Sequence, residues 1–147
     1  MFADLLRRLT APAPSPLAPP DARLALTALL VRVARADNNY TAAERERIDR
    51  VMIAREGFGE AEAAALRAEA EVLEAEAPDT VRFTRAIKDA VPLIDRVRVL
   101  EALWDVALAD GNRDHQEDMA LRLVANLLGV SDVDSGLARQ RVEARRR

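Results

Sequence analysis

Two pairs of acidic residues are the side chains of this sequence best suited to chemistry. Asp37 is followed seven residues later by Glu44, and Asp110 is followed at the same spacing by Glu117. Calcium and magnesium take oxygen ligands, which carboxylates, nearby amide side chains and the unpaired carbonyls of a helix end can supply. The spacing is not that of an EF-hand, whose glutamate comes later in the loop and whose central turn needs a glycine. Any divalent cation site that the pairs form is therefore of another kind.

The same segments also fit ordinary helix starts. Thr41 with Glu44, and Asp114 with Glu117, match the capping box, in which side chains and backbone amides of the first turn bind each other reciprocally. The two aspartates instead follow apolar helices, where the helix dipole disfavours a carboxylate by a few tenths to about 1 kcal/mol. Either a local turn onto the loop amides or a bound cation can compensate them, and the residues alone leave both interpretations open.

Other catalytic groups are scarce. The chain has no cysteine and a single histidine, His115, which excludes disulfides, thiolate zinc sites and dyads of two imidazoles. Its five glycines form neither a phosphate-binding loop nor a dinucleotide fingerprint, and its serines lie in no nucleophile-elbow pattern. We therefore expect a protein that is not an enzyme and has no catalytic residues.

Composition limits the partners. With 22 basic and 25 acidic residues the net charge is −3, so no basic surface for nucleic acid is expected. No stretch is long and apolar enough for a membrane span, and the start of the chain lacks the apolar core and cleavage site of a secretion signal. These features predict a cytoplasmic protein.

The N-terminal segment differs in composition from the rest of the chain. Residues 2–9 can form a short helix with Phe2, Leu5 and Leu6 on one side, and residues 11–20 hold five of the seven prolines, which make a stiff linker. From residue 21 to residue 147 apolar side chains recur with a helical period, and no segment alternates as a strand does. The expected organisation is thus an N-terminal helix and linker, residues 1–20, followed by one helical domain, residues 21–147.

The pattern predicts an all-α fold, a compact bundle of about seven helices. Residues 22–36 and 93–109 are apolar nearly all round, which is typical of buried helices. Gly57 and Gly129 suit the left-handed residue that ends a helix, and Pro92 suits a first turn. Helices are expected at residues 22–36, 42–56, 60–77, 80–91, 93–109, 114–128 and 131–145. The apolar contacts of the third helix are expected from Ala64, Leu66, Val72 and Leu73, and Trp104 is expected in the core with a partner for its indole N–H.

The segment formed by residues 30–51 is repeated at residues 103–124. Eight of these 22 positions are identical, where an alanine-rich composition would give roughly two by chance. The identities pair Leu30, Val33, Ala34, Ala36, Asp37, Asn39, Glu44 and Val51 with Leu103, Val106, Ala107, Ala109, Asp110, Asn112, Glu117 and Val124. Duplicated units commonly pack their equivalent faces together, so we expect a pseudo-twofold fold in which Leu30 and Leu103 lie in one core.

The strings VARADNNYTAAERERID and LWDVALADGNRDHQEDMALRLVANLLGV resemble the two signature segments of the TerB-like tellurite-resistance family. The similarity covers roughly residues 21–145. It implies a compact helical bundle with internal pseudo-symmetry, a cluster of acidic residues that binds a divalent cation, and no catalytic activity. The residues that match the family's acidic positions are Asp37, Glu44, Asp110 and Glu117.

Two functions are consistent with these observations. The first is a non-enzymatic TerB-like domain in tellurite or metal stress, which binds calcium or magnesium at the paired acidic turns. The alternative is a co-chaperone-like module that docks an unidentified protein partner, with the acidic residues serving only as helix caps. We expect Asp110 to carry more of any cation effect than Asp37, because Gly111 follows the family pattern and Asn38 departs from it.

Overall fold

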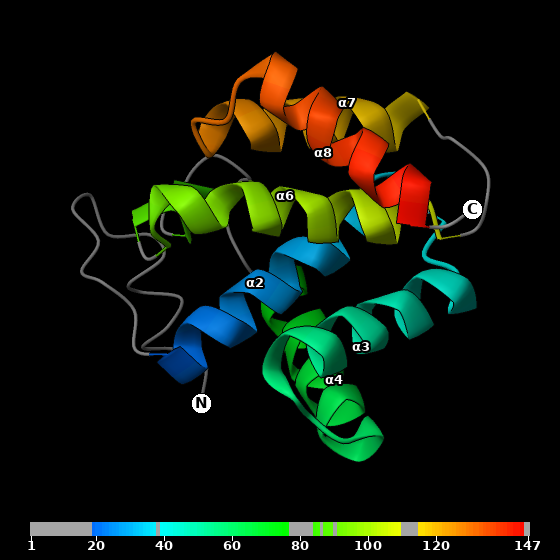
Figure 1. Ribbon diagram of the computed structural model, residues 1–147. Coiled ribbons are helices and arrows are strands. Elements are labelled where there is room, and N and C mark those ends of the chain that lie inside the picture. The colour runs from blue at the N-terminus through cyan, green and yellow to red at the C-terminus, as the bar shows by residue number, and fades with distance from the viewer. Residues whose placement is uncertain are drawn as a thin grey trace.

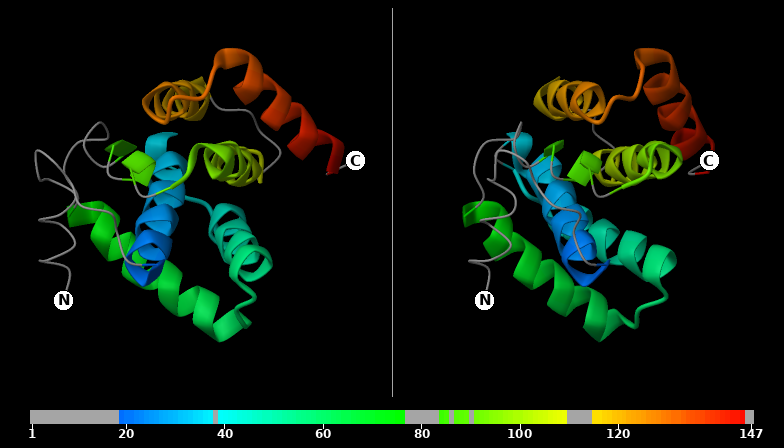
Figure 2. Two further views of the ribbon diagram at one scale, coloured as in Figure 1. Left: turned by 60° about the vertical axis from the view of Figure 1, so that its left-hand side comes forward. Right: turned by 90° about the vertical axis from the view of Figure 1, so that its left-hand side faces the viewer.

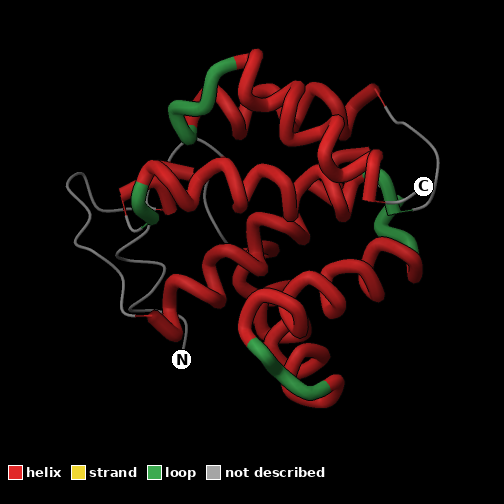
Figure 3. Tube along the Cα trace, viewed as in Figure 1, coloured by secondary structure: helices red, strands yellow, loops and turns green. Residues whose placement is uncertain are grey.

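Helices form the secondary structure of every described part of the chain, and none of the described residues lies in a strand (Figure 3). The computed structural model describes residues 19–37, 39–76, 84–85, 87–89, 91–109 and 115–145, without the side chains of residues 19, 20, 37, 93, 94 and 115–117. The elements in order are α2 (Pro19–Ala34), the 3-10 helix η1 (Arg35–Asp37), α3 (Ala42–Glu56), α4 (Glu60–Glu76), α6 (Leu93–Ala107), α7 (His115–Leu127) and α8 (Asp132–Arg145). The all-α prediction is confirmed.

Two expectations fall partly or wholly outside the described residues. The short helix over residues 2–9 lies outside them, and of the helix expected near residues 80–91 the structure describes residues 84–85 and 87–89, as helix, and residue 91, as a bend.

The helix ends follow local chemistry. α2 begins at Pro19, inside the expected linker, because the first-turn amides of a helix have no partner and proline loses nothing there. Its last turn tightens into η1 rather than continuing as α-helix to residue 36. Gly57 and Gly129 adopt left-handed φ angles of 73° and 77° at the ends of α3 and α7, as predicted.

The repeat extends well beyond residues 30–51. The alignment of residues 30–51 with residues 103–124, when it is continued along the chain, places the unit α2, α3 and α4 onto the unit α6, α7 and α8. Each unit's first helix contacts its own second and third helices, α2 contacts α6, and each first helix also contacts the second helix of the other unit. Exchanging the two units therefore leaves this pattern of contacts unchanged. Figure 1 shows the first unit in the lower half and the second in the upper half of the molecule.

The core forms around α2 and α6. Every residue from Leu24 to Val31 is buried, because α2 is enclosed by α3, α4, α6 and α7 (Figure 2). Thr27, the polar residue of this run, donates its hydroxyl to the Arg23 carbonyl at 2.8 Å, so its burial leaves no donor unpaired. Leu30 and Leu103 are both fully buried in the same core, which confirms the predicted contact between the two apolar helices.

Two detailed expectations differ from the structure. Val72, expected in the core face of α4, is 47% exposed, because that face is formed by Ala63, Ala70 and Leu73. Trp104 is buried as expected, but its indole N–H meets no acceptor among the described residues. The Arg139 guanidinium instead lies over the ring, 5.8 Å from its centroid.

Val33 and Val106 occupy equivalent positions of the two units and are almost completely buried. Replacing either by alanine removes two buried methyl groups and leaves a cavity, so each substitution should lower the free energy of unfolding by roughly 2 kcal/mol. Val72→Ala, in an exposed helical position, should change it by no more than a few tenths of a kcal/mol. Urea unfolding measures all three, and an equal loss in Val72→Ala would contradict the assigned core.

The described core is built from residues between Leu24 and Val142, and the prolines of the preceding segment give it few backbone donors for joining that core. A chain lacking residues 1–18 should therefore melt in one cooperative transition close to that of the full chain. Circular dichroism during heating tests this expectation, and a broad or strongly lowered transition would show that the segment fills part of the core.

Candidate functional site

η1 and α6 end, and α3 and α7 begin, along one side of the molecule, the right-hand side in Figure 1. η1, which ends with Asp37, contacts α7 of the other unit. Ala109, the residue before Asp110, shares a groove of about 400 Å³ with Ala43, Arg47 and other residues of α3. The residues that end each unit's first helical segment thus adjoin the second helix of the opposite unit, an arrangement that follows from the crossing of α2 and α6.

Of the four predicted cation ligands, the structure describes one side chain. Glu44 is described in full, Asp37 and Glu117 are described only in their backbone, and Asp110 lies outside the described residues. Within the described part of the chain, no group of three or more His, Cys, Asp or Glu residues is arranged to hold a metal. With Glu44 alone described, the four predicted ligands are neither shown to lie together nor shown to lie apart.

Glu44 forms the capping box that the sequence predicts. The Glu44 amide donates to Thr41 Oγ1 at 3.1 Å, and Glu44 Oε1 accepts from the Thr41 amide at 2.9 Å and from its hydroxyl at 3.1 Å. The Glu44 residue is fully buried, whereas carboxylates are almost never buried unless they are paired. Because a buried carboxylate loses its hydration, the charge of Glu44 depends on the groups around it more than the charge of a solvated cap does.

Tyr40 holds the loop that precedes this cap. The guanidinium groups of Arg35 and Arg45 lie 5.1 and 5.3 Å from the centroid of its ring, within the range of cation–π attraction. Burial of the Tyr40 hydroxyl, and then the nearby Glu71 carboxylate, raise the pKa of this phenol well above its ordinary value. We call these four residues, Arg35, Tyr40, Arg45 and Glu71, the Tyr40 clamp.

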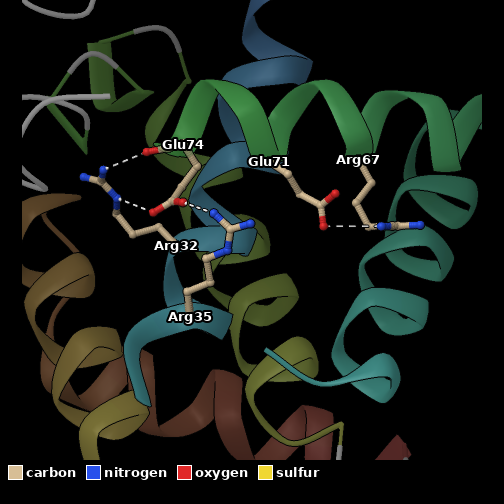
Figure 4. Close-up of polar contacts among 5 residues, drawn as sticks. All are labelled: Arg32, Arg35, Arg67, Glu71 and Glu74. Atoms are coloured by element: carbon tan, nitrogen blue, oxygen red, sulfur yellow. Dashed lines mark hydrogen bonds and ion pairs between the residues drawn. The ribbon is translucent and has the colours of Figure 1, made fainter. Parts of the chain in front are cut away.

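α4 completes the support of the first turn, as Figure 4 shows. Glu74 accepts from Arg35 of η1 at 2.7 Å and from Arg32 of α2 at 3.4 Å, while the Glu74 carbonyl accepts from Arg32 at 3.3 Å. Arg67, one turn before Glu71, binds Glu71 at 3.4 Å and Asp49 of α3 at 2.8 Å. The first acidic turn is therefore tied through charged side chains to a third helix of its own unit.

Sequence reasoning missed this clamp. The available signal was the single tyrosine of the chain, with an arginine five residues before it and another five residues after it. The clamp also includes Glu71 of α4, and no local pattern in the sequence predicts that α4 lies beside Tyr40.

The residues of the Tyr40 clamp do not recur in the second unit. In the alignment of the two units, its four positions become Leu108, Arg113, Asp118 and Ala144. The second helices of the two units also differ in charge. Glu46, Arg47 and Arg50 of α3 line the groove that includes Ala109, whereas the equivalent residues of α7 are Met119, Ala120 and Leu123, which carry no charge.

Since Tyr40 is the only tyrosine, its ionisation can be followed by ultraviolet absorbance without assignment. In the folded protein the phenolate band should appear well above pH 10, and in urea it should appear near the ordinary pKa of about 10. Because the folded pKa is raised, the stability from this burial is complete below about pH 10 and is lost as the pH rises above it.

A matched pair of variants separates the two causes of the raised Tyr40 pKa, burial and the Glu71 carboxylate. Glu71→Gln removes a carboxylate that raises the pKa of Tyr40, so the phenolate should form at lower pH than in the wild type. Glu69→Gln, an exposed change on the same helix, should leave the titration unchanged. A folded-state titration that begins at the ordinary pH would contradict the buried position of the hydroxyl.

Comparison with known proteins supplies the family. A model of the family described as "Tellurite resistance protein TerB" matches residues 23–140. No curated protein and no solved structure gives a significant match. Among the described residues, no helix has both the length and the apolar character needed to cross a membrane. Since the match covers well over half of the 147 residues and the duplicated helical fold agrees with it, the chain belongs to the TerB family of tellurite resistance proteins.

Proposed function

We propose that this TerB domain acts in the response to tellurite or metal stress by binding a divalent cation, calcium or magnesium, without catalysing a reaction. The proposed ligands are the paired acidic turns, Asp37 with Glu44 and Asp110 with Glu117. The cytoplasm is the proposed compartment.

One observation carries the proposal. η1, which ends with Asp37, contacts α7 of the other unit, and Ala109, which precedes Asp110, shares a groove with α3. The residues that end each unit's first helical segment therefore adjoin the second helix of the other unit. A cation bound there would link the two units, and so would favour the folded state over the unfolded chain.

The local environments support the first turn as the stronger of the two. The Tyr40 clamp and Glu74 hold its backbone in place, so fewer degrees of freedom would be lost on binding. The groove that includes Ala109, the residue before Asp110, is lined by Arg47 and Arg50 and by one acid, Glu46, and this net positive charge would oppose a cation. This order is the reverse of the one expected from Gly111 and Asn38.

Thermal melts in calcium, magnesium and chelator test the proposal. A cation that binds only the folded state adds RT ln(1 + [L]/Kd), about 2.7 kcal/mol at one hundred times Kd, and so raises the melting temperature by several degrees. Asp37→Asn should remove most of this increase and Asp110→Asn should remove less. In chelator both variants should melt like the wild type or slightly higher, because an uncharged residue suits the end of a helix better.

Glu69→Gln, which removes an exposed carboxylate of α4, is the control and should keep the full increase. If neither cation raises the melting temperature of the wild type, the acidic turns are helix caps and the interaction-module function replaces this proposal.

A further inference from the structure

α7 and α8 each present a pair of large apolar side chains to solvent. Met119 and Leu123 of α7 are 57% and 45% exposed, and Val133 and Leu137 of α8 are 72% and 45% exposed. Within each pair the residues are four positions apart, so they lie next to each other on one face of their helix. On α7 this face is opposite the one that buries Leu121.

The internal repeat indicates that the four residues share one surface. Their equivalents in the first unit are Glu46, Arg50, Glu60 and Ala64, which line a single groove of about 300 Å³ between α3 and α4. Because α7 contacts α8 as α3 contacts α4, the apolar residues occupy corresponding places. Met119, Leu123, Val133 and Leu137 are named here the α7–α8 patch, and their two helices lie on the outer side of α6, away from α3 and α4 (Figure 2).

The comparison between units shows that the fold does not require an apolar surface at this place. The first unit carries three charged residues at the four positions, and Glu46 and Arg50 pair at 3.6 Å as solvated neighbours on a helix do. In the second unit all four positions are large and apolar. Clustered apolar side chains on a helical face are typical of a surface that binds another protein.

The charges beside the patch fit a second copy of the same chain. Arg122 of α7 is exposed, and Asp132 and Asp134 at the start of α8 are exposed. None of these three forms an ion pair within the described residues. A twofold axis that brought α7 of one copy against α8 of the other would set each Arg122 near the two aspartates of its partner copy.

We propose that two copies of this chain associate through the α7–α8 patch into a symmetric dimer. The four apolar side chains of each copy form the centre, and Arg122 with Asp132 and Asp134 form a polar rim that sets the orientation. This surface lies on residues other than those of the acidic turns, so the proposal does not depend on cation binding.

Analytical ultracentrifugation of the full chain across the micromolar range tests the association. The wild type should approach twice the monomer mass of 16.2 kDa as its concentration rises. The double variant Met119→Glu with Leu123→Arg copies the charged pair of the first unit and should remain a monomer. Its helical circular dichroism should be retained, because Glu46 and Arg50 already occupy equivalent positions in a folded helix.

Two further variants control the interpretation. Val72→Glu changes an exposed apolar residue outside the patch and should leave the association intact. Arg122→Glu should weaken association, and adding Asp134→Arg in the same chain should restore it, because every interface of a symmetric dimer contains both residues. A monomeric wild type at every concentration would overturn the proposal, as would a dimer that the Met119→Glu, Leu123→Arg variant preserves.

Discussion

The contact between α2 and α6 is the constraint on which the rest of the structure depends. α2 is buried along the whole run from Leu24 to Val31, and α6 buries a broad apolar face while Arg98, Glu101 and Asp105 occupy its remaining side, so each helix needs more than one neighbour before its burial becomes favourable. Each helix obtains that cover from its own unit and from the second helix of the other unit. Neither unit could bury its first helix alone, and the duplication therefore produces one domain with a single core rather than two.

Most of this fold could be predicted from the residues. Helical periodicity located α3, α4, α7 and α8, and glycine, proline and threonine set several ends, because these signals act within a few residues. The errors arose where tertiary contacts decide. Val72 and Leu73 are neighbours in an alanine-rich helix, and only the direction of α2 determines which of the two is buried.

The candidate site could be predicted less completely. The repeat identified the acidic turns, and the capping box of Glu44 followed from Thr41 at the right spacing. The burial of Glu44 and the Tyr40 clamp could not be foreseen, because Glu71 and Glu74 reach the turn from a helix that lies far along the sequence. A local motif describes the donors of a turn but not the charges that surround it.

The two units keep their equivalent backbones and differ in what their surfaces carry. The first unit carries charged residues in the groove between α3 and α4, and the Tyr40 clamp holds its turn. The second unit carries the apolar α7–α8 patch at the equivalent positions, and its Ala109 shares a groove with Arg47 and Arg50. Core positions such as Val33 and Val106 are the same residue in both units, since the shared packing restricts them. Surface positions are free of that restriction, and there the equivalent residues of the two units differ in charge and polarity.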